Sequence, residues 1–200
     1  MGNRETPQIN AGSMADIAFL LLIFFLVTTT LNADIGIFKK LPPKTHIDRI
    51  DVNEKNVLEI NINPNNEIQV EGSEIVDAEN IKQIVVDFID NGAGKDINGN
   101  GCDWCNGIKD ITSSDHPTKA IVSLQSSRNT SYGTYLTVQN EINSAYNELR
   151  NRLSNSLYGI SFNTMLVNLK KNKNNSFLKE RIDDIKQKYP LLISELEAVN

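Results

Sequence analysis

The sequence predicts an α+β fold in which a single N-terminal transmembrane helix precedes a small two-layer domain. The first observation behind this prediction is an unbroken apolar run over residues 17–27. The second is an alternation of apolar and polar residues that starts at Val57 and is typical of strands. The third is the recurrence of apolar residues at spacings of three and four in two later segments, which is typical of helices on a core. The expected order within the domain is hairpin, helix, strand, helix and strand.

The composition bounds the size of the domain and the class of partner. The chain has 200 residues, a net charge of −5 and an isoelectric point near 5.1. Without the apolar segment and its linker, roughly 140 residues remain, which is enough for one domain with its own core. Neither the net charge nor any basic block favours nucleic-acid binding, so no nucleic-acid partner is expected. No cofactor is predicted.

The chain divides where its composition changes. Pro42 and Pro43 block helix continuation and favour an extended backbone, which predicts a stiff linker after the apolar segment. The predicted parts are a polar tail over 1–13, a transmembrane helix over 14–33, an extended linker over 34–56 and a domain over 57–200.

Asp16 is the ionisable residue at the start of the apolar run, and the functional hypothesis begins there. About 20 helical residues cross a hydrocarbon core of about 30 Å. A charged side chain inside such a span costs about 2.5–3.5 kcal/mol, and residues kept at that cost usually face a partner protein or a water-filled cavity. Because an apolar environment favours the neutral acid, a carboxyl group in this position could load and unload a proton.

On an ideal helix, Asp16 shares one face with residues four, seven, eleven and fourteen positions later. These residues are Leu20, Ile23, Val27 and Thr30. Because this face is apolar apart from its ends, the partner of the carboxyl group must come from another chain, or the acid must stay protonated.

Two simpler interpretations of the N-terminal segment stay open. In one, Asp16 lies at the level of the lipid headgroups and the helix is only an anchor. In the other, residues 1–33 are a cleaved signal peptide, although the acidic Glu5 and the large Leu31 at the candidate cleavage site argue against this. Charge does not settle the orientation, because Arg4 precedes the span whereas three lysines follow it.

The first half of the domain has the pattern of a hairpin followed by a helix. Apolar residues alternate over 57–62 and again over 68–70, with Pro64-Asn65-Asn66 as the turn. Asp77 can cap a helix over 78–91. Its expected core-facing residues are Ile81, Ile84, Val85, Phe88 and Ile89.

The second half is expected to add a strand, a helix and a last strand. Residues 120–126 predict a strand with Ile121 and Leu124 inward, and residues 191–196 supply the last strand after Pro190. Between them, a helix over about 134–153 should bury Tyr135, Val138, Ile142, Ala145, Leu149 and Leu153.

Two insertions enlarge the domain, over 92–118 and over about 154–188. The polar and mostly basic residues from Arg150 to Lys188 are expected to extend the preceding helix and to add a helical piece over 178–188. A solvated surface explains their charge most simply, and an anionic partner such as a cell-wall polymer is the second interpretation.

The first insertion is rich in Gly, Asn and Asp, and it contains both cysteines of the chain. Cys102 and Cys105 form a CxxC whose simplest interpretation is a disulfide that staples the loop. A thioredoxin-type site would need a helix directly after a strand, and a zinc site would need a second cysteine pair. The residues from Asp96 resemble the start of an EF-hand calcium loop, but Gly107 stands where a bidentate Glu is needed. No metal site is predicted.

Three stretches together resemble the ExbD/TolR family of energy-transducing inner-membrane proteins. They are Ile9-Asn10, the segment from Met14-Ala15-Asp16-Ile17 to Val27-Thr28-Thr29, and Leu41-Pro42-Pro43. The resemblance covers residues 8–43, and beyond Val57 only the order of elements agrees. Where the family usually has Thr-Pro before the aspartate, this chain has Gly12-Ser13-Met14, while the aspartate itself is kept.

The resemblance implies a single-pass protein of the cell inner membrane with a cytoplasmic N-terminus and a periplasmic domain. Two copies of the span would sit inside a pentameric ExbB/TolQ-type partner, so the protein would be a homodimer. Asp16 would be the protonatable group that couples the proton-motive force to movement of the complex. The periplasmic domain would pass that movement to a TonB-type protein that serves outer-membrane transport or, in a TolR-like case, to envelope maintenance.

Two other classes of function stay open. One is a membrane-anchored or exported module that holds peptidoglycan or a partner protein without proton coupling. The other is an enzyme, which the sequence disfavours. The part after the span has only His46 and His116 and no recognisable nucleophile–base pair, so the CxxC is its only candidate chemistry.

Overall fold

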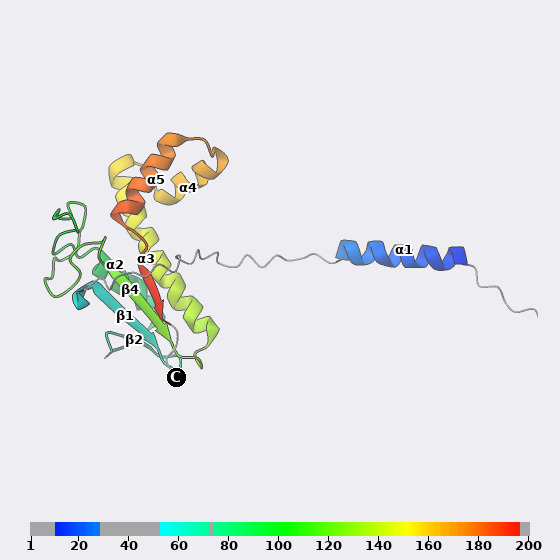
Figure 1. Cartoon of the computed structure of the whole chain (residues 1–200), viewed down its shortest axis with the longest axis horizontal. Coiled ribbons are helices and arrows are strands. Elements are labelled where there is room, and N and C mark those ends of the chain that lie inside the picture. The colour runs from blue at the N-terminus through cyan, green and yellow to red at the C-terminus, as the bar shows by residue number, and fades with distance from the viewer. Residues whose placement is uncertain (1–10, 29–52, 73, 197–200) are drawn as a thin grey trace, which may run out of the picture. The chain divides into compact units, whose positions relative to one another are not determined.

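The computed structural model describes residues 11–28, 53–72 and 74–196, which belong to two separate compact units (Figure 1). The first unit lies within residues 1–48 and the second within residues 49–200. In the first unit the described element is the helix α1, Ala11–Thr28. Its residues are mostly Ala, Leu, Ile and Phe and include no proline, which is compatible with an uninterrupted helix. Within the described residues, no helix meets both the length and the apolarity required to cross a membrane.

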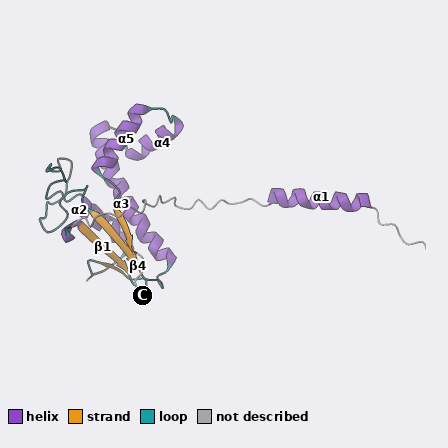
Figure 2. Cartoon of the chain, in the orientation of Figure 1, coloured by secondary structure: helices purple, strands orange, loops and turns teal. Residues whose placement is uncertain are grey.

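The second unit is built on a mixed sheet of five strands among the described residues, drawn in orange in Figure 2. The strands are β1 (Val57–Ile62), β2 (Ile68–Val70), β3 (Glu74–Val76), β4 (Ile121–Ser126) and β5 (Ile193–Leu196). Their spatial order is β3-β2-β1-β4-β5. The strands β1, β4 and β5 run parallel, whereas β2 pairs antiparallel with both of its neighbours.

Four α-helices and one short 3-10 helix complete the described part of this unit. They are η1 (Glu54–Asn56), α2 (Ala78–Ile89), α3 (Tyr132–Tyr158), α4 (Phe162–Lys171) and α5 (Ser176–Lys188). The helices α2 and α3 pack against each other, and α4 and α5 form a helical hairpin against α3 (Figure 1). The prediction of an α+β fold is therefore confirmed.

One face of the sheet carries the core, because alternate side chains of β1 are buried while Glu59 between them is exposed. Leu58, Ile60 and Ile62 belong to one buried cluster with the apolar residues of α2 and α3. Of the residues expected to face the core from these helices, all are buried except Ile84 and Tyr135, which are partly buried. Burial of one face and exposure of the other is the usual consequence of period-two patterning.

The hairpin prediction is confirmed, since β1 and β2 pair with Ile62 opposite Ile68. The predicted helix over 78–91 ends earlier, at Ile89, where Asp90 is the C-cap and donates its backbone N–H to the carbonyl oxygen of Val86. The strand β3 was not predicted. It has only three residues and depends on its pairing with β2, which a local pattern does not reveal.

The prediction that Ile121 faces inward is wrong, because Ile121 is only partly buried while its neighbour Val122 is fully buried. The parallel register pairs Val122 with Leu58 and therefore points Val122 toward the core. The same register pairs Leu124 with Ile60, and Leu124 is buried as predicted.

The basic segment after Arg150 was expected to be a solvated surface, and this is wrong for part of it. The helix α3 continues to Tyr158 and ends at Gly159, whose φ of 66° favours glycine. The unpredicted α4 and the predicted helical piece α5 then contribute four buried side chains to the core, namely Phe162, Met165, Ile182 and Ile185.

Candidate functional site

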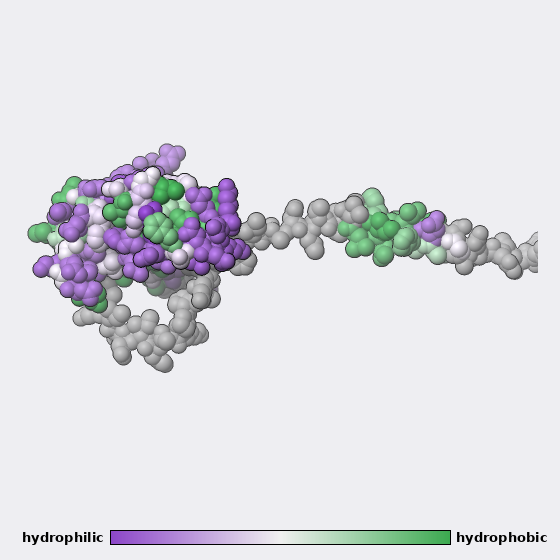
Figure 3. Space-filling model, turned by 90° about the horizontal axis from the view of Figure 1, so that it is seen from above, coloured by the Kyte–Doolittle hydropathy of each residue, from purple (hydrophilic) through white to green (hydrophobic). Residues whose placement is uncertain are grey.

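Asp16 lies near the N-terminal end of α1, and its side chain is exposed. The ten residues that follow it in α1 are all apolar, and each of these side chains is exposed as well. Figure 3 shows α1 as a largely hydrophobic segment, whereas the surface of the second unit in this view is mainly hydrophilic. An apolar surface of this kind marks an interaction site for a protein or a membrane.

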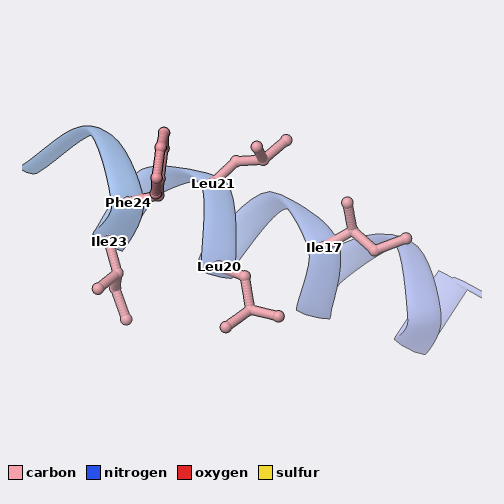
Figure 4. Close-up of a pocket in the computed structure, with 5 residues that line it drawn as sticks. All are labelled: Ile17, Leu20, Leu21, Ile23 and Phe24. Carbon is pink, nitrogen blue, oxygen red and sulfur yellow. The ribbon is translucent and has the colours of Figure 1, made fainter. Parts of the chain in front are cut away.

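The exposed fraction of the large apolar side chains in α1 ranges from 41% at Ile23 to 70% at Leu26. Five of these side chains line an apolar hollow on α1, and they stand out from both sides of the helix (Figure 4). They are Ile17, Leu20, Leu21, Ile23 and Phe24. Because α1 alone lines this hollow, its apolar side chains are available to a partner or to lipid.

Of the predicted face around Asp16, the structure describes two further side chains, Leu20 and Ile23, and both are exposed. Val27 belongs to α1, but the description does not extend to its side chain, and Thr30 lies outside the described residues. The role of Asp16 in proton coupling stays a prediction.

The linker predicted over 34–56 falls mostly outside the described residues, which resume at residue 53. The described part of it includes η1, which Asn53 caps by accepting a hydrogen bond from the backbone N–H of Lys55.

Cys102 and Cys105 are joined by a disulfide with a Cα–Cα distance of 5.5 Å. They lie in the loop between α2 and β4, which contains no helix or strand longer than an isolated bridge among its described residues. The loop is fixed to the end of α2 by Asn91, whose side-chain amide donates to the carbonyl oxygens of Asp110 and Ser114 at 2.8 and 2.7 Å. The two cysteines are 7% and 9% exposed, so the disulfide supports the packing of the loop.

Asp96, which begins the pattern that resembles a calcium loop, and Gly107, which departs from that pattern, both have structural roles. A Cβ atom at Gly107 would lie 2.5 Å from the Cα of Asn91, so glycine is required there for close packing. The carboxylate of Asp96 accepts hydrogen bonds from the backbone N–H groups of Asn98 and Asn100, both at 2.8 Å. The hydrogen bond from Asn100 is the main cause that lowers the pKa of Asp96. This carboxylate therefore closes a turn.

Replacing Cys102 and Cys105 together by serine is expected to lower the free energy of unfolding by about 2 kcal/mol, because the disulfide closes a very short loop. The cellular activity of the protein should be kept, because the disulfide supports the packing of the loop. The measurement is denaturant unfolding of the oxidised and the double-serine proteins, with the reduced wild-type protein as the control. Loss of function in a variant that remains folded would contradict this prediction and would point to redox chemistry.

His116 is 1% exposed and is held in the neutral form by its surroundings. Its Nδ1 accepts a hydrogen bond from the backbone N–H of Thr118 at 3.2 Å and lies 2.8 Å from the Thr118 hydroxyl. Burial is the main cause that lowers the pKa of His116. The unfolded chain therefore binds a proton at a pH where the folded chain does not.

The stability of the domain is consequently expected to be full above about pH 6.5, the ordinary pKa of histidine, and to fall as the pH is lowered below it. The slope contributed by one proton is at most about 1.4 kcal/mol per pH unit. Unfolding curves at several pH values measure it. The slope should disappear in His116→Gln and remain in His46→Gln, and an unchanged slope in His116→Gln would refute the assignment.

A buried polar network that sequence reasoning missed joins four separate segments at Asp90. The Asp90 side chain is 4% exposed and accepts hydrogen bonds from the Tyr189 hydroxyl at 2.5 Å and from Arg152 Nη2 at 2.5 Å. It also accepts the backbone N–H of Asn106 at 3.0 Å. The side chain of Arg150 donates two hydrogen bonds to the carbonyl oxygen of Tyr189, at 3.0 and 2.7 Å.

Burial, reinforced by the nearby carboxylate of Asp90, raises the pKa of Tyr189 and keeps its hydroxyl protonated as a donor. The hydrogen bonds of this network thus connect the end of α2, the disulfide loop, α3 and the residue that follows α5. No local sequence signal marks it, since Asp90 and Tyr189 are 99 residues apart.

Comparison with known proteins gives one family. The model of the family described as "Biopolymer transport protein ExbD/TolR" matches residues 2–154, which is more than half of the chain. No curated protein matches the chain.

Proposed function

Because the chain belongs to the ExbD/TolR family of biopolymer transport proteins, we propose that it is the inner-membrane subunit of a motor driven by the proton-motive force. In this proposal the motor energises TonB-dependent transport across the outer membrane. The observation that carries the proposal is α1, an apolar helix that contains a single carboxylate, Asp16, at the start of its apolar run. Family membership by itself supports a subunit that energises biopolymer transport.

In this proposal residues 14–33 cross the inner membrane once, with the N-terminus in the cytoplasm and the domain in the periplasm. The helix α1 provides residues 14–28 of this span, and its large apolar side chains are exposed on all sides. Covering apolar side chains of this kind with lipid or a membrane protein removes them from water and is therefore favourable.

Asp16 is the coupling residue of the proposed motor. A carboxylic acid that is neutral against an apolar wall and charged beside a polar group of a partner is a switch with two positions. One elementary charge that moves across 100 mV provides about 2.3 kcal/mol, so several protons could drive a sizeable rearrangement.

The proposed partners follow from the family and from the exposed surface of α1. An ExbB/TolQ-type pentamer would surround two copies of the span and cover their apolar side chains, so this protein would act as a homodimer. The domain over 57–200 would pass the movement to a TonB-type protein. A TolR-like role in envelope maintenance and an anchored module that binds peptidoglycan are the alternatives.

The experiment compares three forms of the chain in cells that lack the gene. They are the full chain, residues 45–200 exported behind an unrelated cleavable signal, and the full chain with residues 14–33 replaced by an unrelated apolar helix. Uptake of a large substrate that enters only through outer-membrane transport is the readout, with protein levels measured alongside. The full chain alone is expected to restore uptake.

Restored uptake with the exported domain would overturn the proposal in favour of a binding module. Restored uptake with the unrelated helix would show that α1 is only an anchor. A full chain that restores envelope integrity but not uptake would place the protein in the TolR-like role.

A further inference from the structure

The turn between α4 and α5 concentrates positive charge on a chain that is acidic overall. We define the tip as residues 167–179, which contain four lysines and no aspartate or glutamate, whereas the whole chain has a net charge of −5. The lysines are Lys170, Lys171, Lys173 and Lys179, and all four are exposed. Among the described residues, none of them forms an ion pair. The positive charge of the tip is therefore not neutralised within the described part of the chain.

The tip also exposes apolar surface beside these lysines. Phe177 is 57% exposed and Val167 is 51% exposed. The guanidinium of Arg181 lies 3.9 Å from the centre of the Phe177 ring and 4.6 Å from the centre of the Tyr158 ring. These contacts hold Phe177 in place while leaving more than half of it open to a partner.

Hydrogen bonds and buried side chains hold the tip in one conformation. The backbone N–H of Asn172 donates to the Asn168 carbonyl oxygen at 3.0 Å, and the N–H of Asn175 donates to the Asn172 carbonyl oxygen at 3.2 Å. The side chain of Asn175 caps α5 by accepting the N–H of Leu178 at 3.0 Å. Both helices are anchored in the core by side chains that are at most 2% exposed, namely Phe162, Met165, Ile182 and Ile185. A surface ordered before binding loses less entropy when it binds.

The tip lies outside the family match, which ends at residue 154. Membership of the family therefore does not account for its lysines or for the exposed Phe177.

We propose that the tip binds the headgroups of anionic phospholipids on the surface of the membrane that α1 is proposed to span. Each lysine near an anionic bilayer adds a similar electrostatic attraction to the membrane surface. An aromatic ring in the same segment can in addition enter the interfacial region of the bilayer. The tip contains four lysines that form no ion pair with other described residues, and in the same segment the exposed Phe177, so it provides both contributions. An acidic protein as the partner would explain the lysines of the tip. It would not explain why exposed apolar side chains occur in the same segment.

The tether makes this contact accessible. The 24 residues over 29–52, which connect α1 to the domain, can extend to at most about 86 Å. A domain confined to this distance from the bilayer meets the membrane surface at a high effective concentration, so even a weak contact is populated. The inference rests on the proposed membrane span, and the experiment separates the failure of one from the failure of the other.

The experiment measures amide hydrogen exchange of the full chain in lipid nanodiscs. Discs of phosphatidylcholine alone are compared with discs that contain phosphatidylglycerol. We expect exchange over residues 167–179 to slow several-fold in the anionic discs and to recover at high salt, since surface attraction is screened. Exchange in β1 and β4 should be the same in both discs.

Two triple variants with the same change in net charge test the lysines. Lys170→Gln, Lys171→Gln and Lys173→Gln together should weaken the contact on the order of 100-fold and return the exchange of the tip to its rate in neutral discs. The control replaces Lys95, Lys109 and Arg128 by Gln. These residues are exposed on other loops of the same domain, and the control should keep the protection. Unchanged exchange in β1 shows that a variant remains folded.

Equal exchange of the tip in both kinds of disc, or loss of protection in the control triple variant, would overturn the inference. Protection that appears only when a soluble anionic glycan or an acidic protein is added would overturn it in favour of that partner.

A chain that does not enter the discs would refute the membrane span instead. Mixed with a large excess of preformed phosphatidylglycerol vesicles, which replaces the effective concentration that the tether would provide, that chain should still show a protected tip. An unprotected tip there would overturn the inference as well.

Discussion

Replacing Asp16 by asparagine is expected to reduce proton-dependent transport to background while the amount of protein in the membrane stays unchanged. Asparagine has nearly the same size as aspartate, but it cannot take up or release a proton. It also removes the cost of a charged group in the span, so insertion of the helix should not suffer. The measurement is uptake of a large substrate through the outer membrane, with membrane levels of the protein determined in the same cells.

Two further variants show whether the titratable carboxyl group itself is responsible. Asp16→Glu keeps a group that can bind a proton at a slightly different depth and should keep part of the uptake. Asp34→Asn makes the same chemical change directly after the predicted span and should transport normally. Full uptake in Asp16→Asn would mean that the span is an anchor or that the protein drives another process.

The parts of the structure that follow from local patterns could be predicted from the sequence. The hairpin of β1 and β2 and the buried stripes of α2 and α3 depend on the spacing of apolar residues within one segment. The last strand was also predicted, but β5 begins at Ile193 and is shorter than the predicted 191–196. The candidate site at Asp16 is of the same kind, because a lone carboxylate before an apolar run is visible without any tertiary contact.

Elements that depend on distant partners were missed or misplaced. The inward side of β4 is set by its register with β1, and three-residue strands such as β3 have too few residues for a pattern. The helix α4 did have a local signal. Apolar residues recur at Phe162, Met165 and Leu169, and Ser161 caps the helix by accepting the backbone N–H of Thr164. The lysines that follow outweighed this signal and led to the prediction of a solvated surface.

Asp90→Ala is expected to lower the free energy of unfolding of the domain by about 3–5 kcal/mol, the usual cost of removing one partner from a buried ion pair. The substitution leaves the Tyr189 hydroxyl, the N–H of Asn106 and the guanidinium of Arg152 without their shared acceptor. Because the Arg152 side chain is 37% exposed and can turn to water, the lower part of this range is expected. Denaturant unfolding measures the loss. Asp87→Ala, at an exposed position of the same helix, should change stability by less than about 0.5 kcal/mol.

A double-mutant cycle with Tyr189→Phe decides whether the network acts as one unit. Tyr189 is fully buried, and its hydroxyl donates to Asp90, so each single variant breaks the same hydrogen bond. The double variant should therefore cost at least about 1 kcal/mol less than the sum of the two single variants. Additive costs would show that Asp90 and Tyr189 stabilise the fold independently. A coupling of the expected size would mean that the segment after residue 154, which lies beyond the family match, is integrated into the domain through its polar core as well as through its apolar one.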